Sequence, residues 1–489
     1  MIRHRSLVSA LLLVSVLVAI VGIIRRTPDT NVIVHVIPLD TDPAAMAVDT
    51  STDRTMVISP GAGGRDIPLL SVVNTSAGTL LYSHVLKNSP SGIAIDSQNR
   101  HAFIVYPDPD NTVDVVDQQT GRRIQTIPAG RSALALLSPA EAIGPVAVVD
   151  ERARRLIITA TGALGMFDTI GGRLITRVDV GADPLLVDEE DERLVILNEG
   201  LDVSTIRVAD ARSGALRVAV PIGGIAQTGG VGAVGAGAGR IVVAMNNGVL
   251  VLLDARNGVL IRATRMGVGV QPSMALIDGR ARRAVVVAAT GLVSVLDLRQ
   301  GMIVRSTIVL GGGRPFFLLD PGRGQTAALC ISTGRTFVGG RHAATATVSM
   351  FNTRSGHLMR TVAVPGLTPA FMMVDERSGR LITVANGVLT GHGGYLTHAV
   401  TPGTVNVLDT TTGTLLRTAA IGARPVALSI DEQAGRAIVL TQETDVESIS
   451  ADPWGWLPSW LRHAVPFIPT PRSVTRVVPG SIVVLDTSH

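Results

Sequence analysis

Four histidines are the residues of this sequence best suited to bind a metal ion. They are His342, His392, His398 and His463, and they lie inside long segments that separate short apolar runs. Imidazole nitrogens bind Zn²⁺ at about 2.1 Å when three or four ligands converge on one ion. These four show no tight ligand spacing. We therefore expect these four histidines to be solvated loop side chains, which together form a candidate loop site. We expect no bound metal or other cofactor.

Three tryptophans and a phenylalanine form the densest aromatic cluster. Trp454, Trp456, Trp460 and Phe467 lie close together near the C-terminus, and they include every tryptophan of the chain. Such rings favour the headgroup level of a membrane, and they also dominate many interfaces with a partner. A lid packed on the protein's own surface is the third alternative, and the sequence leaves all three open.

Other motifs are weaker. Asp108-Pro109-Asp110-Asn111 has neither the length nor the spacing of a calcium loop, so a turn is expected there. The stretch Gly229–Gly237 imitates a phosphate loop but lacks its lysine and following helix, so it is expected to form a weak strand. No nucleophile, base and orienting group can be assembled. The sequence therefore favours a non-catalytic protein without excluding an enzyme.

Composition points to an all-β chain that does not bind nucleic acid. Hydrophobic residues make up 46% and charged residues 17%, with 52 glycines and 26 prolines, which suits many short strands joined by tight turns. Lys87 is the single lysine. Arginines are scattered, the net charge is +4 and aromatics are 3%, so no basic face with interleaved aromatics is predicted. Cys330 lies in an apolar run and is expected to be a small buried hydrophobe.

A unit of four short strands recurs from residue 30 onward. Its clearest copy runs from Pro425 to Asp431 and continues at Gly435. The first strand of most units is expected to end in an aspartate, as at Asp320 and Asp431. The expected third strands end at Asn74, Asp117, Asp168, Asp210, Asp254, Asp297, Asn352, Asp409 and Asp486. A basic period of about 43 residues with four strands per unit is typical of propeller blades. The sequence predicts one all-β propeller of about nine blades, with eight or seven as alternatives.

The third-strand ends have the chemistry of tight turns. In Asp409-Thr410-Thr411-Thr412-Gly413 the carboxylate can accept a hydrogen bond from an amide two residues on, and the glycine supplies a positive φ. These acids are therefore expected to form turns and not a catalytic site.

The first strand is expected to complete the last blade. Asn31–Pro38 reads as a fourth strand, whereas the last unit stops after its third at Asp486. Pairing the two would close the ring, remove two open edges and bury the β-branched residues Val32, Ile33, Val34 and Val36. We expect residues 27–489 to be a single domain.

This repeat resembles the YVTN β-propeller family of bacterial and archaeal surface proteins. The resemblance covers roughly residues 31–489 and rests on strand ends such as Thr383-Val384-Ala385-Asn386 and on Val405–Asp409 followed by Gly413. It implies a propeller fold. It implies little about chemistry, because similar repeats serve as surface scaffolds, binding modules and parts of enzymes.

The N-terminus predicts a membrane anchor. Arg3 and Arg5 precede an apolar run from Leu7 to Ile24, which is long enough to span hydrocarbon. We expect residues 1–26 to be a signal anchor, with a transmembrane helix and an extracytoplasmic body. A cleaved signal, which would release a secreted protein, is the alternative.

Three insertions, at 332–347, 386–403 and 441–480, are expected in loops between second and third strands, and thus on one face of adjacent blades. Long loops on a rigid scaffold are where binding usually resides. The sequence predicts a binding or scaffold propeller with a protein or glycan partner. The alternative is a lactonase-like or quinoprotein-like enzyme with its site at the axial mouth.

Overall fold

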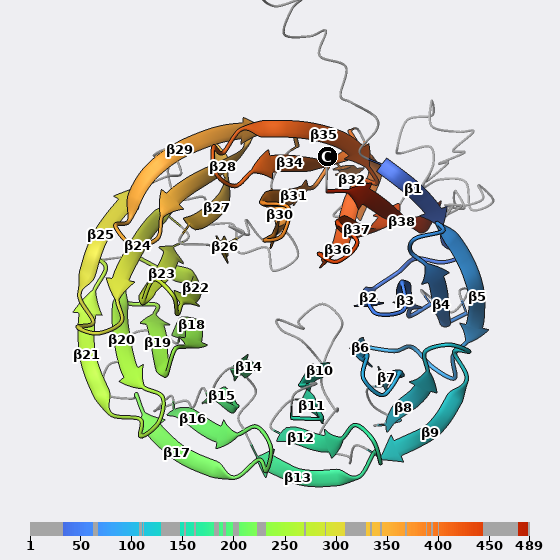
Figure 1. Cartoon of the computed structure of the whole chain (residues 1–489), viewed down its shortest axis with the longest axis horizontal. Helices are drawn as coiled ribbons and strands as arrows, with labels where there is room; N and C mark the ends of the chain where they lie inside the picture. The colour runs from blue at the N-terminus through green and yellow to red at the C-terminus, as the bar shows by residue number, and fades with distance from the viewer. Residues whose placement is uncertain are drawn as a thin grey trace, which may run out of the picture.

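A computed structural model of the chain shows a closed ring of β-sheets around a central axis (Figure 1). The structure describes residues 33–61, 67–106, 110, 112–128, 147–150, 153–160, 163–179, 185–188, 192–198, 205–222, 231–267, 270–288, 290–308, 329–332, 335–342, 345–366, 369–387, 389–392, 395–399, 401–443 and 478–487. These residues form nine four-stranded antiparallel sheets, which we number as blades 1 to 9, and one additional hairpin. The predicted nine-bladed propeller is confirmed.

Blades 1 to 3 follow the N-terminal strand β1 (Ile33–Pro38). Blade 1 contains β2 (Ala45–Asp49), β3 (Arg54–Ser59), β4 (Leu69–Asn74) and β5 (Thr79–Val85). Blade 2 contains β6 (Gly92–Asp96), β7 (His101–Tyr106), β8 (Thr112–Asp117) and β9 (Arg123–Pro128). Blade 3 contains β10 (Ala147–Asp150), β11 (Arg155–Ala160), β12 (Ala163–Asp168) and β13 (Leu174–Asp179).

Blades 4 to 6 continue the same order around the ring. Blade 4 contains β14 (Leu185–Asp188), β15 (Arg193–Asn198), β16 (Thr205–Asp210) and β17 (Leu216–Pro221). Blade 5 contains β18 (Val231–Gly237), β19 (Arg240–Met245), β20 (Val249–Asp254) and β21 (Leu260–Arg265). Blade 6 contains β22 (Pro272–Asp278), β23 (Arg283–Ala288), β24 (Leu292–Asp297) and β25 (Ile303–Ile308).

Blades 7 to 9 include a lengthened central hairpin, an inserted hairpin and the closing strand. Blade 7 contains β26 (Leu329–Ser332), β27 (Arg335–His342), β28 (Thr345–Asn352) and β29 (His357–Val364). Blade 8 contains β30 (Pro369–Asp375), β31 (Arg380–Ala385), β34 (Gly403–Asp409) and β35 (Leu415–Ile421), with the hairpin β32 (Leu389–His392) and β33 (Tyr395–Ala399) inserted. Blade 9 contains β36 (Arg424–Asp431), β37 (Arg436–Glu443), β38 (Val478–Asp486) and β1.

The second and third strands of a blade are apolar on both faces because a neighbouring blade covers each face. In β3 every residue after Arg54 is buried, and β4 is buried at its four central positions. The outer strand β5 instead alternates exposed and partly buried residues along its second half. Nine hydrophobic clusters fill the gaps between neighbouring blades, one cluster per gap in the described part of the chain.

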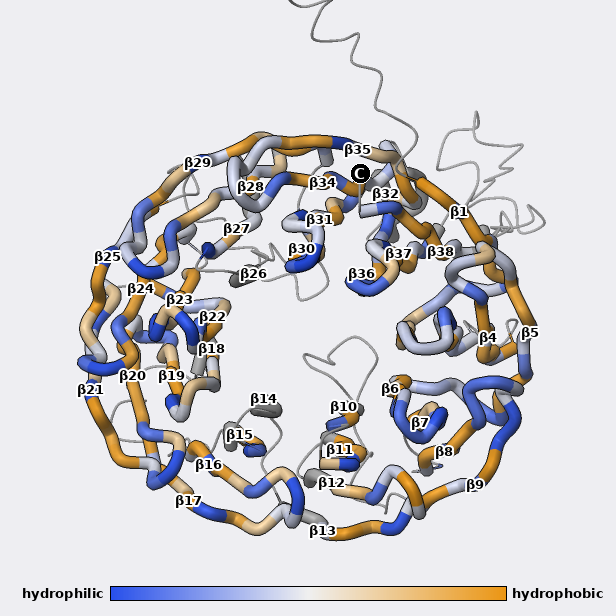
Figure 2. The backbone as a smooth tube through the Cα atoms, in the orientation of Figure 1, coloured by the Kyte–Doolittle hydropathy of each residue, from blue (hydrophilic) through white to orange (hydrophobic). Residues whose placement is uncertain are grey.

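The two faces of the ring differ in how the strands are joined. Within each blade, the connections from first to second strand and from third to fourth strand leave from the same end, because neighbouring strands are antiparallel. We call the face that carries these connections the turn face. The opposite face carries the connections from second to third strand and from one blade to the next, and we call it the loop face. Figure 2 shows hydrophilic stretches where the outer hairpins turn.

The glycine that ends each third-to-fourth turn explains why the turn repeats. Gly214 has φ +69°, and a Cβ there would lie 2.0 Å from Cγ2 of Thr176 in the preceding blade. Gly258 has the same φ, and its Cβ would lie 2.3 Å from Cγ2 of Val220. Only glycine satisfies both demands, a left-handed backbone and close approach of the preceding blade. The predicted turn chemistry is confirmed, since Thr411 N donates to Asp409 Oδ1 at 2.9 Å.

Cationic side chains on the turn face join one blade to the next. The first residue of a second strand donates to a carbonyl just beyond the third strand of the following blade. Examples are Arg54 Nη1 to Gln118 O at 2.8 Å, Arg283 Nε to Arg354 O at 3.0 Å and Arg335 Nη1 to Thr410 O at 2.6 Å. His101 has the corresponding place in blade 2, with Nδ1 3.2 Å from Thr169 O.

The ring closes as predicted, with β1 as the fourth strand of blade 9. Strand β1 pairs antiparallel with β38, from Ile33 opposite Leu485 to Pro38 opposite Ser481. The expected burial is wrong in part, because the pleat turns Val34 and Val36 outward, at 44% and 58% exposure. The alternate residues, including Ile37, face the neighbouring blades, since side chains on a strand alternate between its two faces.

Two sequence predictions concern segments that lie wholly or partly outside the described residues. The predicted anchor, residues 1–26, lies outside them, and no helix among the described ranges is long and apolar enough to cross a membrane. Much of the predicted insertion 332–347 consists of β27 and β28, which are two residues longer than most second and third strands. The first strand of blade 7 ends at Ser332, and Asp320, which the repeat suggested for that position, is outside the described part.

Candidate binding face

The two longest second-to-third connections lie on the loop face of blades 8 and 9, next to a lengthened central hairpin in blade 7. Blade 7 extends its central hairpin to His342 and Thr345, and blade 8 inserts the β32–β33 hairpin between its second and third strands. In blade 9 the chain leaves β37 after Glu443 and returns at Val478, and these two residues pair with each other. All three departures lie in second-to-third connections of consecutive blades, so they share one face.

The backbone places three of the four predicted histidines on this face. His342 ends β27 opposite Thr345, and His392 ends β32 opposite Tyr395. His398 lies in β33 opposite Thr390. His463, the three tryptophans and Phe467 lie outside the described residues. Among the residues that are described, no group of three or more His, Cys, Asp or Glu side chains is arranged to hold a metal ion.

The base of the blade 9 insertion is firmly held. Gln442 Nε2 donates to Pro43 O at 2.7 Å, which ties the end of β37 to the segment before blade 1. Thr441 Oγ1 and Ser481 Oγ lie 2.9 Å apart and join β37 to β38, and both residues are buried. The described residues on either side of 444–477 are therefore joined to each other and to the segment before blade 1.

A polar cluster that the sequence did not predict lies on the loop face between blades 1 and 2. Lys87 Nζ donates to Thr112 Oγ1 at 2.6 Å and lies 4.4 Å from the centre of the Tyr106 ring. Its ammonium is also 3.8 Å from Asp110 Oδ2 and 3.7 Å from Asp114 Oδ1. The one available signal was that Lys87 is the only lysine of the chain. Its partners lie 19 or more residues away, so no local motif connects them.

The chemistry of this cluster favours a structural role. Asp114 accepts a hydrogen bond from Thr126 Oγ1 at 2.6 Å, and Asp110 accepts one from Asn88 Nδ2 at 2.7 Å. Burial, followed by the nearby Asp114 carboxylate, raises the pKa of Tyr106 above its usual value, so the phenol stays protonated at neutral pH. The ammonium holds the link between blades 1 and 2 against β8. The predicted turn at Asp108–Asn111 contributes Asp110 to it, and residues 108, 109 and 111 are outside the described part.

The turn-face carboxylates are occupied by the backbone. The amide of Gly171, 3.0 Å from Asp168 Oδ1, is the main cause that lowers the pKa of Asp168. The amide of Thr412, at 2.7 Å, does the same for Asp409. For Asp117 and Asp297, burial alone would raise the pKa, but hydrogen bonds from the turn outweigh it and the pKa is lowered. As predicted, these acids hold turns together.

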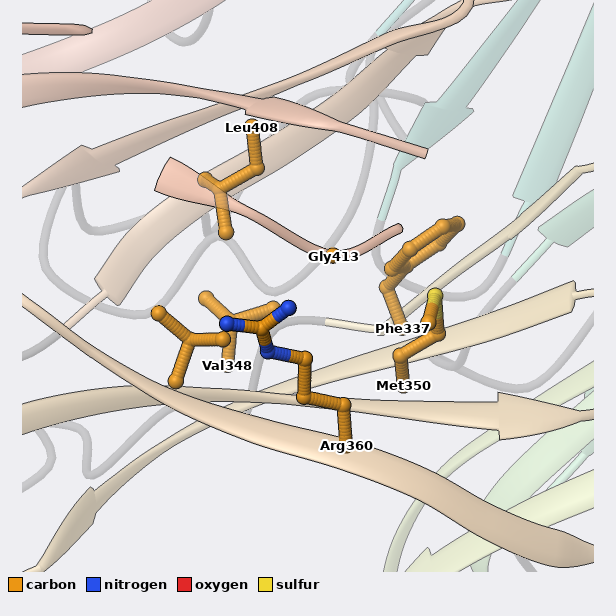
Figure 3. A pocket seen from close by; sticks show the side chains of 7 residues that line it. Phe337, Val348, Met350, Arg360, Leu408 and Gly413 are labelled. Atoms are coloured by element: carbon orange, nitrogen blue, oxygen red, sulfur yellow. The ribbon is translucent and has the colours of Figure 1, made fainter. Parts of the chain in front are cut away.

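A small pocket lies between blades 7 and 8 (Figure 3). Its volume is about 10 Å³, which is at the threshold for one water molecule. Arg360 donates from Nη1 to Thr412 O at 3.1 Å. The lining residues are Phe337, Val348, Met350, Arg360, Val362, Leu408 and Gly413. The pocket is too small for an organic ligand and is a packing gap between blades.

Comparisons with known proteins find similar folds but no family. No family model and no curated protein matches the sequence. The computationally designed Ika8 protein is 16% identical, covers 72% of this chain and 96% of its own, and has a TM-score of 0.47. BamB from Moraxella catarrhalis is 15% identical, with coverage of 84% and 97% and a TM-score of 0.45.

A third similar structure is the quinohemoprotein alcohol dehydrogenase ADHIIG from Pseudomonas putida HK5. It is 12% identical, with coverage of 80% of this chain and 73% of its own and a TM-score of 0.47. Similarities this distant carry no inference about activity, ligand or partner.

Proposed function

We propose that this chain is a non-catalytic binding or scaffold propeller that uses the loop face of blades 7 to 9 to hold a protein or glycan partner. One observation carries the proposal. The repeat is kept on the turn face, whereas the two longest second-to-third connections and a lengthened central hairpin lie on the loop face of three consecutive blades. In a repeat protein, insertions that share one face usually mark the binding face.

The charged groups of the repeat support this function over catalysis. The acids of the third-to-fourth turns accept backbone hydrogen bonds, and the cations of the second strands hold neighbouring blades together. A charged side chain that holds a turn or joins two blades in this way cannot also serve as an acid, base or nucleophile without weakening the ring. The aromatic segment with Trp454, Trp456, Trp460 and Phe467 supplies anchors of the kind that interfaces favour.

The proposal includes a location and a family. Residues 1–26 act as a signal anchor, and the propeller faces the extracytoplasmic side, at the cell surface or in the periplasm. The apolar run Leu7–Ile24 with its basic start supports this. The repeat belongs to the YVTN type. Its support is the recurring third-strand aspartate followed by a closing glycine, as at Asp409 and Gly413.

Site-specific photocrosslinking in cells tests the binding face. A photoreactive residue replaces Pro402, exposed on the loop face of blade 8, or Gln300, exposed on the turn face of blade 6. We expect a discrete adduct from position 402, lost when Leu389–Ala399 is removed, and none from position 300. Equal adducts at both positions, or adducts from position 300 alone, contradict the proposal.

Elemental analysis and an absorption spectrum of the purified chain separate this function from the alternative. The alternative is a lactonase-like or quinoprotein-like enzyme with its site at the axial mouth. A stoichiometric metal or a visible chromophore would favour that enzyme and count against the scaffold.

A further inference from the structure

Blades 5 to 7 form a strongly basic sector of the ring. Residues 231–366 contain fifteen arginines and four aspartates, and no lysine or glutamate. The net charge of the whole chain is only +4, so the remaining residues carry an excess of acid that hides this sector in the overall composition. Strands β18–β29 lie within this stretch and form three consecutive blades, and Arg314, Asp320 and Arg323 are outside the described part.

The described aspartates of the sector do not pair with its exposed turn arginines. Asp254 Oδ2 accepts from Arg240 Nη1 at 2.8 Å, and Asp297 pairs with Arg283. Asp278 is 7% exposed and accepts from the amide of Ala281 at 2.8 Å. The second oxygen of Asp278 is buried without a hydrogen-bond partner, and none of the three described aspartates forms an ion pair with an arginine other than Arg240 or Arg283.

Exposed arginines recur at one turn position in these blades. Arg256, Arg299 and Arg354 each lie two residues after the end of the third strand, on the turn face of blades 5, 6 and 7. Arg280 and Arg282 are exposed in the first-to-second turn of blade 6. No carboxylate among the described residues lies within ion-pair distance of these five. We call Arg256, Arg280, Arg282, Arg299 and Arg354 the basic arc.

At the same turn position of blade 4, a carboxylate neutralises the arginine. Arg212 lies two residues after Asp210, but its guanidinium pairs with Glu192 through two hydrogen bonds. The arc therefore ends where a carboxylate appears opposite the repeated arginine.

The N-terminal strand enters the ring on the same face. Ile33 pairs with Leu485, two residues before Thr487, whose amide donates to Gly435 O in the first-to-second turn of blade 9. Six residues separate Arg26 from Ile33, and at about 3.3–3.6 Å per residue the seven steps between the two Cα atoms span at most about 25 Å. An anchor at residues 1–26 would therefore hold the turn face close to the membrane.

We propose that the basic arc binds the headgroups of anionic phospholipids, so that the turn face lies against the membrane and the loop face points away from it. The inference rests on the proposed anchor, which supplies the first contact at blade 9, while the arc supplies a second across the ring. A flat anionic surface fits the arc because its arginines are spread over short turns of three blades. Guanidinium groups recognise phosphate well, and basic residues near an anionic bilayer each add about 1 kcal/mol, which is about a fivefold gain in affinity.

Arginine footprinting of the full chain tests the proposal. The chain is reconstituted into vesicles of phosphatidylcholine, with or without phosphatidylglycerol, and its arginines are modified with phenylglyoxal and read by mass spectrometry. We expect the basic arc to react about fivefold more slowly in the anionic vesicles, and high salt to remove the protection. Arg265 and Arg424 are exposed at the loop-face ends of β21 and β36, and should react equally in both.

Two variants sharpen the test. In R256Q/R299Q/R354Q, the remaining Arg280 and Arg282 should lose their protection. In Glu192→Gln, the freed Arg212 should gain it. Equal reactivity of the arc in both kinds of vesicle, or equal protection of Arg265 and Arg424, overturns the proposal. Protection that grows with protein concentration in the absence of lipid also overturns it, since a second copy would then be the occupant.

Experiments on the full chain distinguish a basic arc that does not bind lipid from an N-terminal segment that does not anchor the protein. Alkaline carbonate extraction reports on the anchor, because an anchored chain stays with the membrane. If the full chain is released, co-sedimentation of that soluble chain with the two kinds of vesicle reads the arc alone. Binding to the anionic vesicles that R256Q/R299Q/R354Q weakens about tenfold or more supports the arc even then, and absence of such binding overturns it.

Discussion

The turn face and the loop face are built from the same nine repeats, yet they treat the repeat differently. On the turn face, eight blades close their outer hairpin with a glycine at φ between +62° and +69°, packed against the blade before. On the loop face, blade 7 lengthens its central hairpin and blade 8 inserts a second hairpin. In blade 9, residues 444–477 separate the second strand from the third. The difference shows where the sequence is tied to the neighbouring blade and where it is free to change.

The seam between β1 and β38 should give the largest effect. Deleting Asn31–Pro38 removes Ile37, which is 2% exposed, together with the partly buried Ile33, and leaves the edge of β38 unpaired. Each such side chain contributes roughly 1.5–3 kcal/mol, less the cost of ordering the strand. We expect a loss of several kcal/mol in the free energy of unfolding, with aggregation through the open edge.

Thermal melting and size-exclusion chromatography measure this loss. Deleting residues 1–26 instead leaves every described strand in place and serves as the control. If the chain without Asn31–Pro38 melts within about a degree of that control, closure by β1 contributes little to stability.

The loss of stability on replacing a turn glycine should depend on how closely the neighbouring blade approaches it. In Gly214→Ala the new Cβ meets Thr176 at 2.0 Å and the backbone needs φ +69°, so we expect a loss of about 2–3 kcal/mol. In Gly413→Ala the nearest atom, Met350 Cε, is 3.2 Å away, so about 1 kcal/mol is expected. Gly171→Ala meets nothing within 4 Å and should stay within about 0.5 kcal/mol.

Chemical denaturation gives these three free energies of unfolding. The order Gly214, Gly413, Gly171 is the prediction, and equal losses at all three would mean that contact with the preceding blade does not select the turn glycine.

Acid should weaken the turn face first. The pKa values of Asp117, Asp168, Asp297 and Asp409 are lowered in the folded state. A lowered folded pKa stabilises the protein above the unfolded value of about 3.9 and loses this contribution as the pH falls through the folded value. The melting temperature should therefore drop below about pH 4. Replacing the four acids by asparagine should flatten that drop, and an unchanged pH profile would speak against their role.

Removing the β32–β33 hairpin should have the smallest effect on stability. Replacing Leu389–Ala399 by a short Gly-Ser link leaves β31 paired with β34, and shortening a surface loop changes its closure entropy only slightly. We expect a change below about 1 kcal/mol by denaturation, together with loss of partner crosslinking at position 402. A large loss of stability would place this hairpin among the structural elements of blade 8.

The sequence predicted the parts of the fold that repeat. Recurring aspartates and glycines fixed the blades, and the missing fourth strand after Asp486 identified the closing strand. Blade 7 was predicted less well, because Asp320 satisfied the pattern locally while the ladder of blade 7 starts at Leu329. The sequence also did not predict which side chains of β1 are buried. Val34 and Val36 are as apolar as their neighbours, and only the pairing with β38 sets which alternate residues point inward.

The candidate sites were harder to predict because they join residues far apart in the sequence. Lys87 meets Thr112 and Asp114 only after two blades stack. The basic arc is hidden in a net charge of +4, and it becomes visible only when blades 5 to 7 are counted apart from the rest. The histidines are on the expected face, but no strand ladder joins His342 to the β32–β33 hairpin within the described ranges.

The seam of the ring also sets how the protein would carry a mechanical load. Strand β1 runs from the turn face to the loop face, and it joins the ring through hydrogen bonds to β38 and packing against the neighbouring blades. A pull on the N-terminus, directed away from the turn face, acts along β1 and loads its whole ladder in shear. The pairs from Ile33 to Pro38 would then have to yield together instead of one after another, so a short strand is able to resist a force that would unzip a hairpin pulled from its open end.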